Sequence, residues 1–331
     1  MRFVTFSAVL LATLVACAVP GEDVASSTDD VEASALASGL REVKGFGKNP
    51  GALRMFEHVP SNLRENAPVV VVLHGCMTGA ANIADTGWND LADARGFVAV
   101  YPQQSYFNNG TYCFNWADPM GFGHDDAERG GGESESIREM TLDAVRRHHG
   151  DATRVFAVGF SAGAAMAIDL AAVYPDVYAG VASFAGVPYG CASTLPESVK
   201  CMIPGIERSS AEHARRVTTA FPGYSGRRPK MSIWQGGIDS VVWPGNQDEL
   251  VKQWSTLHGV GAKPSTSSSA SGITHAEWKN AAGDVVLETY RIADMWHGFP
   301  VDPSHGCGRV AQFVPDEGIC GASKVADFFG L

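Results

Sequence analysis

The stretch Gly159-Phe160-Ser161-Ala162-Gly163 decides the fold of this chain. It matches the pattern G-x-S-x-G, in which a serine lies on a sharp turn between a strand and a helix, with its hydroxyl exposed above a parallel sheet. Residues 154–158 are a short apolar run that predicts a buried strand, and the Ala-rich residues 164–174 predict a helix. Glycine on both sides of the serine suits a turn in which backbones approach closely. The context therefore favours a nucleophilic serine at position 161 over an ordinary glycine-rich turn.

Strand and helix patterns alternate along the rest of the chain. Uninterrupted apolar runs are typical of strands that helices cover on both faces. Strands are expected at residues 53–59, 69–73, 97–101, 154–158, 180–184, 231–234 and 285–292, and helices at residues 89–95, 136–149, 164–174, 247–258 and 325–329. The Ser/Thr-rich residues 265–271 are expected to form a surface loop. This alternation predicts an α/β protein with a mostly parallel central sheet flanked by helices, the architecture of the α/β-hydrolase fold.

A catalytic serine needs a base that takes its proton and a carboxylate that orients the base. In this fold the acid and the histidine follow the serine in that order, each just after a strand. Asp239 and His297 meet both conditions, so Ser161, Asp239 and His297 are the predicted triad. His305 is the rival base, but it lies further from the end of a strand. This chemistry uses neither a metal nor an organic cofactor.

The oxyanion hole is predicted from two backbone positions. One N–H comes from the residue after the nucleophile and the other from the loop after an early strand, which here are Ala162 and Cys76. His74 is expected to order that loop by hydrogen bonding and not to react. The aromatic residues that we expect either to line the substrate site or to fill the core are Trp88, Trp116 and Trp296.

The amino terminus carries a targeting signal. Residues 1–17 combine an early positive charge with an apolar run that is too short to span a membrane, which is typical of a signal peptide. The residues ending at Cys17 resemble a bacterial lipobox, so lipidation of Cys17 would be the means of membrane attachment, although an A-x-A cleavage site fits equally. Residues 18–42 are expected to form a disordered tether, and residues 43–331 to form the catalytic domain.

The charge and one long irregular segment limit the possible partners. A net charge of −11 gives no footprint for nucleic acid. Residues 103–133 are expected to be irregular, and loops of that length are usually functional or disordered. Within them, residues 124–128 are interpreted as a solvated acidic loop, because their carboxylates lack the spacing of a calcium-binding loop. The sequence does not indicate an oligomeric state.

Six cysteines follow the amino-terminal segment, and an even number in an exported chain suggests three disulfides. Short separations favour Cys191–Cys201 and Cys307–Cys320, which leaves Cys76–Cys113, although 15 connectivities are possible for six cysteines. A zinc site is the alternative, but the chain has no paired C-x-x-C motif.

Several motifs together resemble one family, the extracellular poly(3-hydroxybutyrate) depolymerase esterases, which are akin to feruloyl and acetylxylan esterases of carbohydrate esterase family 1. The motifs are Gly45-Phe46-Gly47-Lys48-Asn49-Pro50-Gly51, His74-Gly75-Cys76, Gly87-Trp88-Asn89, Cys113-Phe114-Asn115-Trp116, Pro188-Tyr189-Gly190-Cys191-Ala192 and Met295-Trp296-His297-Gly298. The resemblance covers roughly residues 43–331. It implies a secreted serine esterase with the same triad and with disulfides.

Two features depart from the family pattern. Residues 117–129 form a longer and more acidic connection than usual, and the sequence ends with the catalytic domain, whereas polymer-degrading members commonly carry a linker and a substrate-binding domain. The leading hypothesis is an esterase that acts on poly- or oligo(3-hydroxyalkanoates). The alternative enzyme is a feruloyl or acetylxylan esterase acting on plant polysaccharide esters. A catalytically idle surface protein that binds a partner is the hypothesis from another class.

Overall fold

The computed structural model describes residues 33–35, 38–117 and 126–331. Its centre is one sheet of ten strands in the order β1-β2-β4-β3-β5-β6-β7-β10-β9-β8. The strands are β1 (Arg41–Val43), β2 (Arg54–His58), β3 (Val69–Leu73), β4 (Val98–Gln103), β5 (Val155–Phe160), β6 (Gly180–Phe184), β7 (Lys230–Gly236), β8 (Thr266–Ala270), β9 (Ile273–Lys279) and β10 (Val285–Ile292). From β4 to β10 all neighbours are parallel, and antiparallel strands extend both edges. The predicted α/β-hydrolase fold is confirmed.

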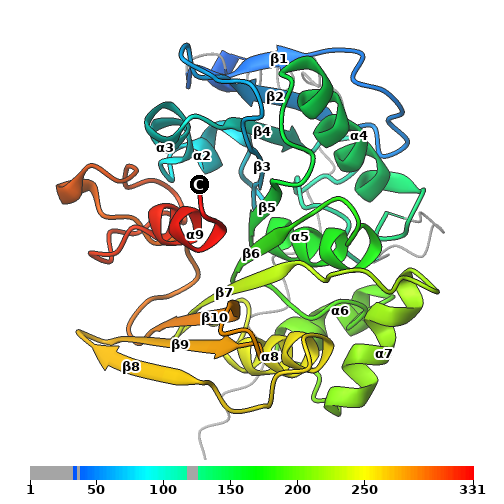
Figure 1. Ribbon diagram of the computed structural model, residues 1–331, viewed down its shortest axis with the longest axis vertical. Helices are drawn as coiled ribbons and strands as arrows, with labels where there is room; N and C mark the ends of the chain where they lie inside the picture. Colours follow the sequence, from blue (N-terminus) through cyan, green and yellow to red (C-terminus); the bar gives the residue numbers. More distant parts are fainter. Residues whose placement is uncertain (1–32, 36–37, 118–125) are drawn as a thin grey trace, which may run out of the picture.

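Helices cover both faces of the sheet (Figure 1). They are α2 (Ala80–Ala84), α3 (Trp88–Arg95), α4 (Gly132–Arg147), α5 (Ala162–Val173), α6 (Leu195–Met202), α7 (Ser210–Ala220), α8 (Gly245–Leu257) and α9 (Gly321–Phe329). Helices α2, α3 and α9 lie on one side of the sheet, and α4, α5, α7 and α8 lie on the other. None of the described helices is long and apolar enough to cross a membrane.

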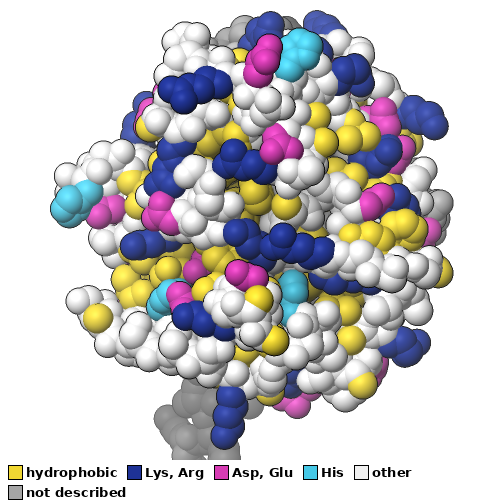
Figure 2. Space-filling model, in the orientation of Figure 1, with side chains coloured by type: hydrophobic (Ala, Val, Ile, Leu, Met, Phe, Trp, Pro, Cys, Tyr) yellow, Lys and Arg dark blue, Asp and Glu magenta, His cyan; other side chains and the backbone are white. Residues whose placement is uncertain are grey.

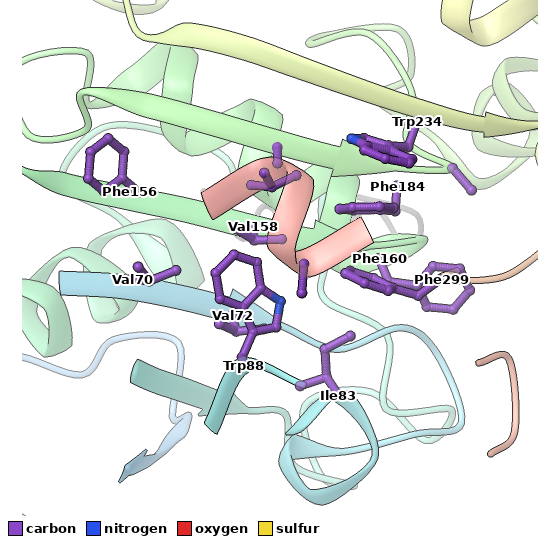
Figure 3. Packing of buried hydrophobic residues seen from close by; sticks show 14 of the residues in the cluster. Val70, Val72, Ile83, Trp88, Phe156, Val158, Phe160, Phe184, Trp234 and Phe299 are labelled. Carbon is purple, nitrogen blue, oxygen red and sulfur yellow. The ribbon is translucent and has the colours of Figure 1, made fainter. Parts of the chain in front are cut away.

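Two hydrophobic cores result from this layering, because successive side chains of a strand point to opposite faces. In β3, Val70 and Val72 belong to the core beneath α9, whereas Val69, Val71 and Leu73 belong to the core beneath α5. Figure 3 shows the first core, in which aromatic rings from β5, β6 and β7 surround α9. Every residue of α5 is buried, so the helix that begins at the elbow lies at the centre of the molecule.

The packed part of the chain begins earlier than the sequence predicts. Residues 18–42 were expected to form a tether, but β1 begins at Arg41 and pairs with β2. Ala35 and Leu40 are also buried in the core beneath α9. A strand of three residues carries too short a pattern to be recognised. The predicted signal peptide with Cys17, and most of the acidic stretch including His124, lie outside the described residues.

Other elements differ from the expectation because their polar residues are paired or exposed. Residues 265–271 contain the edge strand β8 and not only a loop, and all five residues of β8 are exposed, so no alternation of apolar side chains marked it. Helix α4 begins at Gly132 and not at residue 136. Its first turn is polar but buried, and its side chains are hydrogen-bonded to distant parts of the chain, so no apolar pattern marked it. Strand β9 and helices α2, α6 and α7 were not predicted.

Candidate active site

Ser161 occupies a strained turn between β5 and α5. Its backbone angles are φ 56° and ψ −120°. Residues other than glycine rarely adopt this conformation, and it often marks functional sites. A Cβ at Gly159 would overlap the backbone of Gly163, and a Cβ at Gly163 would overlap the carbonyl oxygen of His74. The two glycines of the motif are therefore needed so that the turn can close against the end of β3.

The structure brings Ser161, His297 and Asp239 together from the ends of three strands. Nε2 of His297 lies 2.9 Å from Oγ of Ser161, and Nδ1 of His297 lies 2.8 Å from Oδ2 of Asp239. His297 and Asp239 are buried, whereas Ser161 is partly exposed. The hydroxyl can thus be reached from the surface, while the base and the acid behind it are shielded from water.

The carboxylate of Asp239 is held by three donors besides the histidine. Its Oδ1 accepts hydrogen bonds from the backbone N–H groups of Val241 at 2.8 Å and Val242 at 2.9 Å. Its Oδ2 accepts a hydrogen bond from Nε2 of Gln235, a buried residue near the end of β7. These bonds fix the orientation of the carboxylate, so that Oδ2 faces Nδ1 of His297.

Two glycines let the segment that carries the histidine approach the segment that carries the acid. A Cβ at Gly236 would overlap the carbonyl oxygens of Met295 and Trp296. A Cβ at Gly237 would overlap the carbonyl oxygen of Ala293. Glycine at both positions therefore allows the contact between β7 and the loop after β10 that places His297 beside Asp239.

The loop after β3 lies against Ser161. A Cβ at Gly75 would be only 3.3 Å from Cβ of Ser161. The N–H of Met77 is used in a bond of 2.7 Å to the carbonyl oxygen of Thr111. Among the described residues, the backbone N–H groups of Cys76 and Ala162 have no hydrogen-bond acceptor. Neither N–H is therefore occupied by an acceptor within the described part of the protein.

His74 orders this loop from within. Its Nδ1 lies 2.8 Å from the carbonyl oxygen of Gly75, and its Nε2 accepts a bond of 3.1 Å from the N–H of Gln104. Burial lowers the pKa of His74 to about 4. The neutral ring therefore donates from Nδ1 and accepts at Nε2, which agrees with the ordering role expected for it.

The three tryptophans named from the sequence have different surroundings. Trp296 is 47% exposed, its ring centroid lies 6.2 Å from that of His297, and its Nε1 donates to Oγ of Ser240. Trp116 is partly buried against the core beneath α9. Trp88 is fully buried in that core, so it cannot line the substrate surface. The sequence could not distinguish these cases, because the rotation of α3 decides which way Trp88 points.

Phe313, an aromatic residue close to His297, was not predicted from the sequence. Phe313 has its ring centroid 6.0 Å from those of His297 and Phe160, and 6.3 Å from that of Trp296. It lies in the irregular segment between the 3-10 helix η1 (Pro303–His305) and α9, where no periodic pattern marks a residue as buried or functional. The ring of Phe313 reaches His297 only through contacts that form on folding, so no sequence pattern pointed to it.

Other candidates do not join the site. His305 is exposed and bonds Asp302 and Ser304, so it is not the residue beside Ser161. No group of three or more potential metal ligands occurs among the described residues. A cavity of about 1040 Å³ is lined by Lys230, His275 and other residues of β7, β9, β10 and α9, but by none of the triad residues. This cavity is therefore separate from the predicted triad.

The residues that the structure describes form three disulfides, and they are the pairs that the cysteine spacing favours. Cys191–Cys201, Cys307–Cys320 and Cys76–Cys113 have Cα–Cα distances of 5.9, 5.7 and 4.2 Å. The last of these joins the loop that carries the Cys76 N–H to the segment after β4.

Comparisons with known proteins show the family of this chain. The sequence profile of a family described as "Esterase PHB depolymerase" matches residues 52–279. The chain belongs to this esterase PHB depolymerase family. This confirms the resemblance found in the sequence, and it makes the protein a carboxylic ester hydrolase of the PHB depolymerase family.

Relatives within and around the esterase PHB depolymerase family carry three kinds of name. A poly(3-hydroxyalkanoate) depolymerase C of Paucimonas lemoignei is 42% identical over 295 residues, which cover 88% of this chain and 70% of that protein. A feruloyl esterase B of Thermothelomyces thermophilus is 37% identical over 235 residues, which cover 69% of this chain and 78% of that protein. The solved structure of an acetyl xylan esterase from Aspergillus awamori aligns with a TM-score of 0.74 and 26% identity, covering 88% of this chain and 98% of that chain.

Proposed function

We propose that this protein is a secreted serine esterase that hydrolyses ester bonds of poly- or oligo(3-hydroxyalkanoates) through a triad of Ser161, His297 and Asp239. The observation that carries the proposal is the continuous pair of hydrogen bonds, 2.9 Å from Ser161 to His297 and 2.8 Å from His297 to Asp239. Such a chain activates a serine hydroxyl, which is a weak nucleophile on its own.

The first half of the reaction forms an acyl-enzyme. Oγ of Ser161 attacks the ester carbonyl carbon while Nε2 of His297 takes the hydroxyl proton. The carbonyl oxygen becomes an oxyanion, which the N–H groups of Cys76 and Ala162 stabilise. The tetrahedral intermediate collapses when His297 returns the proton to the leaving alkoxide, so an alcohol departs and the acyl group stays on Ser161.

The second half releases the acid. A water molecule gives a proton to His297 and attacks the acyl carbon, and the Oγ–carbon bond breaks as the proton returns to Ser161. Asp239 stabilises the imidazolium in both halves without taking its proton. No step requires a redox change or an additional cofactor.

Exposed apolar side chains next to the catalytic residues support a polyester substrate. Met77, Ile238 and Trp296 are 61%, 58% and 47% exposed. They directly follow Cys76, or precede Asp239 and His297, in the sequence. An exposed apolar side chain is unremarkable alone, but here three are sequence neighbours of residues in the proposed site. They would contact the alkyl backbone and side groups of a polyester, and the 42% identical relative named as a poly(3-hydroxyalkanoate) depolymerase supports this choice.

The alternative is a feruloyl or acetylxylan esterase. The TM-score of 0.74 to the acetyl xylan esterase supports it, as does the exposed ring of Trp296, which suits a sugar or a phenolic group as well as an alkyl chain.

The deciding experiment compares three substrates with the wild type and Ser161→Ala. Amorphous polyhydroxybutyrate granules, methyl ferulate and acetylated xylan are incubated with each protein, and released 3-hydroxybutyrate, ferulate and acetate are measured. We expect release from granules by the wild type only. Cleavage of only ferulate or acetyl esters would transfer the protein to the polysaccharide esterases. If a fluorophosphonate probe fails to label folded wild type at Ser161, the idle surface protein becomes the better description.

Secretion is part of this proposal. The three disulfides support an oxidising location outside the cytoplasm. We infer that one of two cleavages occurs. Either residues 1–17 are removed as a signal peptide, or cleavage falls before Cys17 and leaves a lipidated Cys17 as the first residue. Mass spectrometry of the mature amino terminus distinguishes these outcomes, because two acyl chains and a thioether-linked glyceride add a characteristic mass to Cys17, whereas simple cleavage adds nothing.

A further inference from the structure

The loop that carries the Cys76 N–H depends on a neighbouring segment for its position. That segment, residues 104–115, follows β4 and contacts three of four consecutive loop residues. The contacts are the bond from the Gln104 N–H to His74 Nε2 at 3.1 Å, the Cys76–Cys113 disulfide, and the bond from the Met77 N–H to the Thr111 carbonyl oxygen at 2.7 Å. A displacement of residues 104–115 would therefore move the Cys76 N–H relative to Ser161.

A single buried carboxyl group holds both ends of the 104–115 segment. Oε1 of Glu133 accepts hydrogen bonds from Nε2 of Gln104 and, at 2.8 Å, from Nδ2 of Asn115. Oε2 of Glu133 accepts a bond of 2.8 Å from the Asn115 N–H. Nε2 of Gln104 also donates to the carbonyl oxygen of Cys113 at 2.8 Å. The carboxyl thus joins the first and last residues of the segment and, through Gln104, the disulfide itself.

Glu133 is well anchored for such a role. It is the second residue of α4 and is fully buried. Its own N–H donates to Oδ1 of Asp126 at 2.9 Å. A Cβ at Gly51 would overlap the backbone of Glu133, so the chain before β2 packs directly on it. Because Ile137 and Met140 of the same helix are buried in the core beneath α5, the carboxyl is tied to the rigid part of the fold.

We propose that Glu133 is a positioning residue for the oxyanion hole, which holds residues 104–115 so that the Cys76 N–H faces the reacting carbonyl oxygen. The inference rests on the proposed function, because it needs Ser161 to be the nucleophile. Glu133 itself does not touch the substrate. Its effect passes through Gln104, Asn115 and the Cys76–Cys113 disulfide.

The nature of the reaction makes this effect measurable. An oxyanion donor acts mainly on the transition state, because the negative charge develops there. A misplaced donor therefore lowers kcat and leaves KM nearly unchanged, and removal of one such donor lowers kcat by about a hundredfold or more. A loss that arose only from partial unfolding would instead reduce the amount of active protein.

The test uses Glu133→Ala and Glu133→Gln with p-nitrophenyl butyrate as substrate. We expect kcat to fall by about tenfold or more in Glu133→Ala and by less in Glu133→Gln, since glutamine keeps one acceptor oxygen, with KM within about twofold of the wild type. Active-site titration with a fluorophosphonate normalises each rate to competent protein. Asp143→Asn is the matched control, because Asp143 is a buried acid of the same helix that bonds Arg147 and does not contact residues 104–115.

Asn115→Ala keeps Glu133 and removes one donor of the same contact, so it decides the matter if the Glu133 variants do not fold. We expect it to lower kcat in the same direction as Glu133→Gln. A titrated Glu133→Ala or Asn115→Ala with wild-type kcat, or with a change in KM alone, would overturn the inference. Failure of the proposed function would look different, because the wild type would then be inactive or Ser161→Ala would retain its activity.

Discussion

Nε2 of Gln235 lies 3.1 Å from Oδ2 of Asp239, the same carboxylate oxygen that is 2.8 Å from Nδ1 of His297. The Gln235 amide also donates to the carbonyl oxygen of Val242 at 2.9 Å, in the loop whose N–H groups bind the other carboxylate oxygen. Gln235 therefore fixes both the acid and its loop, although no sequence pattern marked it.

Replacing Gln235 with alanine should weaken catalysis more than folding. Without its amide, Asp239 keeps two backbone donors but can rotate away from His297, so we expect kcat to fall by about tenfold, the scale that small misplacements of catalytic groups produce. Gln247→Ala is the control, because Gln247 is also buried and bonds strand carbonyls at Ile233 and Tyr290 without contacting Asp239. Steady-state rates on p-nitrophenyl butyrate compare the two. Equal losses would assign Gln235 a purely structural role.

The two contrasting tryptophans give a prediction that separates stability from substrate contact. Trp88→Ala should lower the free energy of unfolding by about 3–5 kcal/mol, the usual cost of removing a large buried ring. Trp296→Ala should leave that free energy within about 0.5–1 kcal/mol, because its ring is half exposed, and it should raise KM for the ester. Urea unfolding and initial rates on both variants provide the measurements. If Trp88→Ala were as stable as the wild type but had a raised KM, Trp88 would be a substrate contact and not a core residue.

The candidate site was predictable from the sequence where its signals are local. The glycines around Ser161, the apolar run before it and the strands before Asp239 and His297 each lie within a few residues, so the order of strands and motifs was sufficient. The fold class followed from the same alternation. His74 was also predicted to order its loop by hydrogen bonding, and its bonds to the Gly75 carbonyl oxygen and the Gln104 N–H agree with this.

The remaining features depend on partners that are distant in sequence. The first turn of α4 is polar, so the sequence suggests that it is exposed, but it is buried. Glu133 accepts a bond from the N–H of Asn115, and Ser136 accepts a bond from the N–H of Gly51, which is 85 residues away. Helix α7 carried a signal that was overlooked, the serine cap at Ser209 that accepts a bond from the N–H of Glu212. Strand β8 offered no signal, because it pairs with β9 at the edge of the sheet and all five of its residues are exposed.

The buried carboxyl of Glu133 should make stability depend on pH. Burial, followed by the charge of Asp126, raises the pKa of Glu133 to about 8 from 4.5, against the opposing effect of its amide donors. A carboxyl with a higher pKa in the folded state binds its proton more tightly there. Its contribution to the free energy of unfolding is therefore present below about pH 4.5 and is lost as the pH rises towards 8.

Glu133→Gln removes this titration. The free energy of unfolding of the wild type should therefore fall relative to that of the variant as the pH rises from 5 to 8. Asp169 in α5 also faces this carboxyl and is present in both proteins. Urea unfolding at several pH values measures the difference at each pH. A constant difference across the range would mean that Glu133 does not change its protonation state there.

The disulfide at the oxyanion loop should affect both stability and rate. Cys76→Ser with Cys113→Ser opens a loop of sequence separation 37, and we expect the free energy of unfolding to fall by about 2–4 kcal/mol. The Cys76 N–H remains, but it loses one of its ties to residues 104–115, so kcat should also fall.

The double variant Cys191→Ser with Cys201→Ser is the comparison, because that disulfide joins residues separated by only 10 positions and does not touch the oxyanion loop. It should cost less stability, since a shorter loop constrains the unfolded chain less. It should also leave kcat closer to the wild-type value. Thermal unfolding and titrated rates on both double variants measure the two effects separately. If the two double variants lowered kcat equally, the Cys76–Cys113 disulfide would act only through global stability. The position of the oxyanion loop would then depend on the contacts of His74 and Met77 alone.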